Sequence, residues 1–180
     1  MFLTHDTVDG ITFRYALVVV DVASRYVDAE VLSNKNAESV ARAFERIYSR
    51  RLEYPKTLIV DEGKEFKGAV SRLMKENDVR IRRGEPGNHR AQAFVERANR
   101  KIAERLYTHQ YAQEYLLPDS ERSRVWVMRL RKVISAINRE PRRILTGETP
   151  TEAIDLDKVK LSDVKYRRPA GADEISTFSW

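Results

Sequence analysis

The stretch TLIVDEGKEF, residues 57–66, joins an apolar run to a cluster of charges around a glycine. Leu58 to Val60 predict a short buried β-strand that ends at Asp61. Ligands of open α/β sheets gather at the carboxyl ends of strands, so Asp61 stands where such proteins carry catalytic groups. Taken alone, the segment fits a solvated loop better than a site, and the surrounding sequence has to decide between the two.

The sequence ahead of this strand predicts an antiparallel meander. Residues 13–21 form a β-rich apolar run, and residues 26–32 alternate between polar and apolar side chains. Asp9-Gly10 is a turn signal ahead of the first run, and residues 1–4 predict a further short strand.

Beyond the meander the hydrophobic period changes, which predicts helices. The elements expected are a helix over 37–49 with Asn36 as its N-cap, the strand 57–60, a helix around 70–74, a strand over 79–82, a mobile loop over 84–90, and helices over 91–106, over 124–138 and from a capping box at 149–152. This order predicts an α/β fold with a mixed β-sheet flanked by helices. We expect one core domain over residues 1–155 and a tail or linker over 156–180.

Composition and charge narrow the class of protein. The 180 residues include no cysteine and three histidines, which excludes a disulfide framework and makes a zinc site unexpected. No apolar stretch is long enough to span a bilayer, so we expect an intracellular protein without a membrane partner, nuclear if the host is eukaryotic. Residues 80–105 hold eight positive and three negative side chains, a net charge of +5. Such a concentration favours nucleic acid as the partner.

A second acidic candidate, Glu96, lies 35 residues after Asp61 in AQAFVERANRKIAERL, residues 91–106. On a helix, Glu96, Asn99 and Arg100 share one face. Mg²⁺ prefers oxygen ligands and is often held by one or two carboxylates plus substrate phosphate oxygens. A carboxylate beside Asn and Arg therefore suits a metal ion held against a phosphodiester, and two such ions can stabilise both oxygens of an in-line displacement.

The two segments together resemble the catalytic core of the retroviral and retrotransposon integrase family, with its D,D-35-E motif. The matching residues are Asp61, Gly63, Phe66, Gln92, Val95, Glu96 and Asn99, and VVVDVASRYVDAEVL and TGETPTEAI resemble further segments of such cores. The resemblance implies an RNase H-like fold and DNA strand transfer with Mg²⁺ or Mn²⁺, with two ions in the complete site. It also implies Asp61 and Glu96 as catalytic metal ligands and a homo-oligomer on the DNA of element ends. The residues expected to contact DNA are His89, Arg90, Gln92, Arg97, Asn99, Arg100 and Lys101.

The sequence departs from the family pattern at two places. Glu62 stands where the family usually has asparagine. The family's first catalytic Asp belongs on the first strand, and residues 1–4 resemble the remainder of that strand with the Asp just ahead of Met1. We therefore expect the chain as given to be inactive. Asp6, expected in the following turn, is the one substitute within the chain that we consider.

Two alternatives to an active integrase core stay open at this point. One is a DNA-binding and multimerising integrase remnant without catalysis, which the absent first Asp favours. The other is an insertion-sequence transposase with the same fold. For His89, an ordinary loop histidine and a phosphate contact fit equally well. Trp126 is expected in the core or in a subunit interface rather than as a base-stacking platform.

Overall fold

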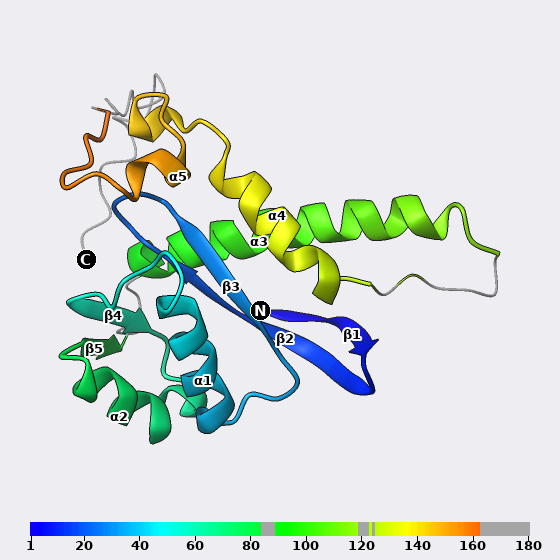
Figure 1. The fold of residues 1–180 in the computed structure, drawn as a ribbon, viewed down its shortest axis with the longest axis horizontal. Helices are drawn as coiled ribbons and strands as arrows, with labels where there is room; N and C mark the ends of the chain where they lie inside the picture. Colours follow the sequence, from blue (N-terminus) through cyan, green and yellow to red (C-terminus); the bar gives the residue numbers. More distant parts are fainter. Residues whose placement is uncertain (84–88, 119–122, 124, 163–180) are drawn as a thin grey trace, which may run out of the picture.

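A three-stranded antiparallel sheet in the order β1-β2-β3 forms the centre of the computed structural model (Figure 1). The structure describes residues 1–83, 89–118, 123 and 125–162. The strands are β1 (Phe2–Val8), β2 (Ile11–Val20) and β3 (Val27–Leu32). Asp9 and Gly10 join β1 to β2 with φ of 49° and 76°, the left-handed conformation that two-residue hairpin turns require. The predicted meander is confirmed, and β1 is longer than expected.

A second sheet pairs β4 (Thr57–Val60) with β5 (Arg80–Arg83) in parallel. Val60 lies opposite Arg83, so the two strands end side by side. The short helix η1 (Lys64–Phe66) and helix α2 (Ala69–Glu76) connect them. The antiparallel and parallel pairings that we expected within one mixed sheet are thus divided, among the described residues, between two sheets.

One face of the central sheet packs against helix α1 (Ala37–Tyr48), which also contacts α2. The apolar spacing of α1 places its buried residues on one side, as predicted. Asn36 caps the helix, because its Oδ1 accepts the Ser39 N–H at 2.8 Å. The buried residues of this layer include Leu17, Leu32, Val40, Phe44, Ile47, Leu58, Val60, Val70 and Met74.

The opposite face of the sheet is covered by two helices, α3 (His89–Glu114) and α4 (Val127–Asn138), which cross each other (Figure 1). Alternation along β2 sends Leu17 to the α1 side and Ala16 to the α3 and α4 side. The buried residues of this second layer include Leu3, Ala16, Val27, Ala29, Ala98, Ile102, Leu106, Trp126, Leu130 and Ile137. Trp126 therefore belongs to the core, as expected.

Polar side chains fix both ends of α4 against the sheet. At the start, Asp6 Oδ2 accepts the backbone N–H groups of Trp126 and Val127, each at 2.8 Å. At the end, the Asn138 side chain accepts the Val27 N–H at 2.9 Å and donates to the Val27 carbonyl at 2.7 Å. Both polar residues are buried. A carboxylate at a helix N-terminus satisfies amides that have no partner within the helix and interacts favourably with the helix dipole.

The expectation for Asp6 is therefore wrong in its place. Asp6 lies within β1 rather than in the following turn, and its carboxylate is engaged by α4. The pairing of β1 with β2 is irregular between Phe2 and Asp6. A bulge of this kind breaks the alternation of side chains, so that Leu3 and Asp6, three residues apart, are both buried. The bonds to α4 thus argue against Asp6 as a metal ligand.

The described chain ends in two short helices, η2 (Arg143–Leu145) and α5 (Pro150–Ala153). The capping box predicted at the start of α5 is present, with Thr149 and Glu152 bonded to each other. Helix α3 begins at His89, so the end of the predicted loop is helical, and the rest of that loop lies outside the described residues. Among the helices that the structure describes, none is long and apolar enough to cross a membrane.

Candidate active site

Asp61 follows β4 directly and is exposed, as the sequence predicts. Its Oδ1 accepts the Gly63 N–H at 3.1 Å. A Cβ on Gly63 would lie 2.6 Å from Glu65 Oε2 and 2.9 Å from Asp61 Oδ1. Gly63 therefore matters for close approach, because it lets two carboxylates, Asp61 and Glu65, lean over the same backbone position.

Met1, directly ahead of β1, is affected by the charges at this place. The Met1 amine donates to the Ala16 carbonyl at 3.0 Å. Burial lowers the pKa of the amine and the charge of Lys35 lowers it further, whereas the charges of Asp61 and Glu65 oppose the decrease. Charges act on a pKa in this way only at short range. The Met1 amine therefore lies within electrostatic range of the end of β4 and of η1.

Glu96, the second predicted ligand, lies on α3 with its side chain exposed. The helix is oriented by its apolar stripe, in which Ala98, Ile102 and Leu106 are buried against the sheet. Within the part of the chain that the structure describes, no three His, Asp or Glu side chains form a group that could hold a metal ion. The shared metal site of Asp61 and Glu96 stays a prediction.

The structure separates the predicted DNA-contacting residues into different environments. Arg97 and Arg100 are exposed, and neither has an ion pair among the described residues. Lys101 is half-buried and forms an ion pair with Glu140. Asn99 Oδ1 is buried and has no hydrogen-bond partner in the described part of the chain. The side chains of His89, Arg90 and Gln92 lie outside the described residues.

Glu140 explains why the charge of α3 is not all available to a ligand. It pairs with Lys101 and Arg105, and Arg142 lies 3.9 Å from it. Burial, together with the neighbouring Arg142 and Arg105, lowers the pKa of Lys101. One carboxylate thus holds α3 to the segment after α4, and Arg97 and Arg100 carry the free positive charge of this part of the helix.

The site also contains residues that sequence analysis did not single out. Glu65 stands beside Asp61, and its only signal is its position two residues after Gly63. Arg25, in the turn between β2 and β3, reaches the Phe94 ring on α3. No periodicity or spacing connects Arg25 with Phe94, so only the fold could place this pair together.

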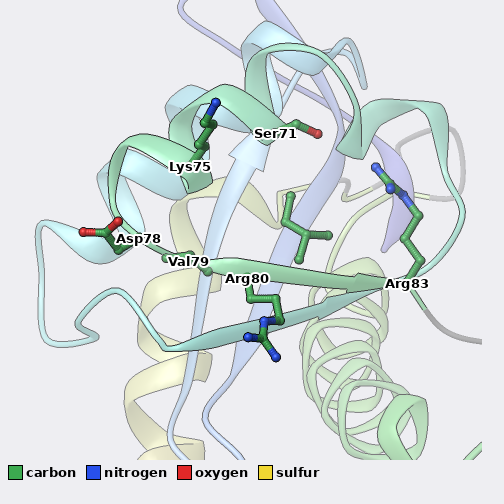
Figure 2. A pocket seen from close by; sticks show the side chains of 7 residues that line it. Ser71, Lys75, Asp78, Val79, Arg80 and Arg83 are labelled. Carbon is green, nitrogen blue, oxygen red and sulfur yellow. The ribbon is translucent and has the colours of Figure 1, made fainter.

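A second basic feature is an open pocket of about 420 Å³ along β5 and α2 (Figure 2). Lys75 of α2 and Arg80 and Arg83 of β5 line it, and Asp78 is its acidic residue. Arg83 lies at the end of β5 that neighbours the end of β4. The pocket was not predicted, and it adds a basic surface along the second sheet.

Replacing Asp61 with asparagine should leave the melting temperature of the metal-free protein unchanged or slightly raised. The side chain is exposed, and an asparagine oxygen can still accept the Gly63 N–H. The change also removes one of two negative charges beside Gly63. Differential scanning fluorimetry in EDTA measures the effect, with the exposed neighbour Glu62→Gln as the control. A large loss of stability in Asp61→Asn alone would make Asp61 a structural residue.

Comparison with known proteins shows which family and which fold this chain resembles. Residues 3–89 match the family profile of the integrase core domain. The fold as a whole is that of retroviral integrase catalytic cores. The chain therefore has the RNase H-like fold of integrase cores, its residues 3–89 match an integrase core domain, and the resemblance found in the sequence is confirmed.

The individual relatives come from a transposon and from retroviruses. A transposon-derived protein of Caenorhabditis elegans is 32% identical over 145 residues, which covers 80% of this chain and 46% of that protein, so the chain spans about half the length of this relative. The simian T-cell lymphotropic virus intasome, in complex with the PP2A regulatory subunit B56 gamma, aligns with a TM-score of 0.68 at 17% identity, covering 93% of this chain and 58% of that one. The HTLV-2 integrase catalytic core in complex with magnesium aligns with a TM-score of 0.61 at 17% identity, covering 84% of this chain and 90% of that one. The catalytic core of BIV integrase aligns with a TM-score of 0.58 at 24% identity, covering 83% of this chain and 89% of that one.

Proposed function

We propose that the chain is the core of a DNA integrase from a transposable element or virus, a polynucleotidyl transferase that joins DNA strands with Mg²⁺ or Mn²⁺. The observation that carries the proposal is the edge of the fold where Asp61 follows β4 beside Glu65, within electrostatic range of the Met1 amine. Open α/β sheets gather their ligands at this end of the strands. The integrase core profile over residues 3–89 and the transposon-derived relative support the same class of reaction.

In this proposal, Asp61 and Glu96 are the metal ligands that the described chain supplies. The donor type fits, since both are exposed carboxylates and Asp61 uses Oδ1 for its one described hydrogen bond. Two carboxylates are too few to hold two metal ions, and no group of three candidate ligands occurs among the described residues. When bound, the metal ions would stabilise the charge that develops on the attacking and leaving oxygens.

A carboxylate on an extension of β1 would complete the set. The Met1 amine already lies within the electrostatic range of Asp61 and Glu65. Residues placed ahead of Met1 would continue along β2, opposite Leu17 and Val18, because Met1 pairs with Ala16. A side chain two residues ahead of Met1 would then face the same side as Ala16 and Val18, which is the side covered by α3.

DNA binding in this proposal rests on Arg97 and Arg100. Their guanidinium groups are exposed on the helix that carries Glu96, and neither is paired within the described chain. Contacts of arginine with phosphate are largely independent of sequence and weaken as salt rises, since they release counterions. The same proposal includes assembly as a homo-oligomer on DNA ends. It also places the protein inside the cell, in the nucleus if the host is eukaryotic.

Exchanging Arg97 and Arg100 together for glutamate should weaken binding to a short duplex by at least about tenfold at low salt. Lys101 is left unchanged, because its loss would also break the contact with Glu140. A mobility-shift titration measures the effect. The matched control is Arg42→Glu with Arg72→Glu, two exposed arginines of α1 and α2, which changes the net charge equally. Equal weakening in both double variants would move DNA binding away from α3.

A DNA-binding integrase remnant without catalysis is the second candidate function. The observation that favours it is the lack of three clustered metal ligands in the described part of the chain. It predicts the same loss of DNA binding in the α3 variant. It differs in predicting no DNA cleavage even when a carboxylate is supplied on an extension of β1.

A further inference from the structure

The turn between β2 and β3 contacts α3 at Phe94, two residues before the proposed catalytic Glu96. The guanidinium carbon of Arg25 lies 4.3 Å from the centre of the Phe94 ring, and that of Arg97 lies 4.9 Å from the same ring. Phe94 and Arg97 flank Glu96 on the helix. A cation over an aromatic face is attracted by the electrons of the ring, so Phe94 holds two guanidinium groups in one place.

The backbone of this turn is rigid and does not itself call for arginine. Asp21 Oδ2 accepts the Ser24 N–H at 2.7 Å and the Ser24 hydroxyl at 2.6 Å. Arg25 has φ of 62°, a left-handed conformation that favours glycine or asparagine. A residue that is unfavourable for its backbone often marks a functional position.

No carboxylate neutralises the guanidinium groups of Arg25 and Arg97 among the described residues. Neither Arg25 nor Arg97 forms an ion pair in the described ranges, and Asp21, the nearby acid, is bonded to Ser24. Burial lowers the pKa of Arg25, the charge of Arg97 lowers it further, and Asp21 opposes the decrease. Arg25 Nη1 is also buried without a hydrogen-bond partner among the described residues. Two cations held together in this way would be stabilised by an anion between them.

We infer that Arg25 and Arg97 together bind one backbone phosphate of DNA, with Phe94 as the platform that holds both guanidinium groups. The inference rests on the proposed function and adds to it a contact from the turn between β2 and β3. Arginine suits the task because its planar fork of N–H donors matches phosphate oxygens. The bound phosphate would lie over the Phe94 side of α3, so Arg25 positions the DNA strand and takes no part in the chemistry.

The experiment is a fluorescence-anisotropy titration of a labelled duplex at several salt concentrations. Arg25→Gly removes the guanidinium and suits the left-handed backbone, so the melting temperature should not fall. The affinity of Arg25→Gly for DNA should drop several-fold at low salt. The slope of log Kd against log salt should decrease by the amount that corresponds to about one lost phosphate contact. Arg42→Gln, which removes one charge from α1, is the control and should bind like the wild type. If Arg25→Gly lowers the melting temperature, Arg25→Asn, also compatible with this backbone, carries the same expectation.

A double-mutant cycle tests whether the two arginines hold the same phosphate. The loss in the Arg25→Gly, Arg97→Gln double variant should be smaller than the product of the two single losses, since either change alone already breaks the shared contact. Full additivity, or wild-type affinity and salt slope in Arg25→Gly, would overturn the shared site and leave the proposed function standing. A wild-type protein that does not bind DNA at low salt would overturn both.

Discussion

Adding Asp-Leu ahead of Met1 should give the protein metal-dependent cleavage of DNA, whereas adding Leu-Asp should not. Both extensions have the same composition and charge, and they differ only in the side of β1 that receives the carboxylate. The chain of residues 1–180 alone should be inactive, because its described residues offer no group of three metal ligands. A two-metal site needs a ligand placed between the ions.

The difference between the two extensions follows from the pairing of β1 with β2. Met1 and Ala16 exchange backbone hydrogen bonds, each of 3.0 Å, so an added residue directly ahead of Met1 would lie opposite Leu17. Leu17 packs on the α1 side, while Val18 packs on the side of α3 and α4. Opposite residues of an antiparallel pair share one face. Only an Asp two residues ahead would therefore face the helix that carries Glu96.

Nicking of supercoiled plasmid in Mn²⁺ is the measurement, since it needs no particular DNA sequence. The Asp-Leu protein should exceed both the unextended and the Leu-Asp protein by at least about a hundredfold, and Asp61→Asn or Glu96→Gln should remove the activity. Cleavage by the unextended chain would contradict the need for an added carboxylate. Two inactive extensions with intact DNA binding would favour the remnant without catalysis.

The parts of the fold that sequence could predict are those governed by local periodicity. Alternation along β2 and β3, the apolar stripe of α1 and the capping box at Thr149 each depend on residues close together in the chain. The same is true of Asp61, which stands directly after an apolar strand. These features arise from short-range sterics and burial, so the sequence carries their signal.

The parts that sequence could not predict depend on contacts between distant residues. Lys101 and Glu140 are 39 positions apart, and nothing in the helix pattern indicates that this lysine is paired. Asp6 lies 120 positions from its partner Trp126, and a bulge in β1 decides which way it points. Arg25 reaches Phe94 only because the sheet brings the turn beside α3. The same residue types fit solvent, a ligand or an ion pair until the fold assigns them.

Asp6→Ala should lower the free energy of unfolding by about 2–4 kcal/mol, the largest stability effect that we expect for a polar residue of this protein. Asp6 is 6% exposed, and its carboxylate accepts the N–H groups of Trp126, the N-cap of α4, and of Val127, its first residue. Alanine would leave these two N–H groups without a partner in a buried place, and each unsatisfied donor is unfavourable by about 1–3 kcal/mol. Asp6→Asn, which keeps an acceptor oxygen and loses the charge, should have a smaller effect.

Urea denaturation followed by circular dichroism gives the stability, with the exposed Asp157→Ala as the control carboxylate. Hydrogen exchange adds a local test, because the amides of Trp126 and Val127 should lose protection in Asp6→Ala before those of α1 do. The same variant separates structure from catalysis. In the protein with the Asp-Leu extension, Asp6→Asn should keep its nicking activity, since its carboxylate belongs to α4 and not to the metal site. If Asp6→Asn is stable and yet abolishes cleavage, Asp6 is a catalytic residue, and the cap on α4 is not its main role.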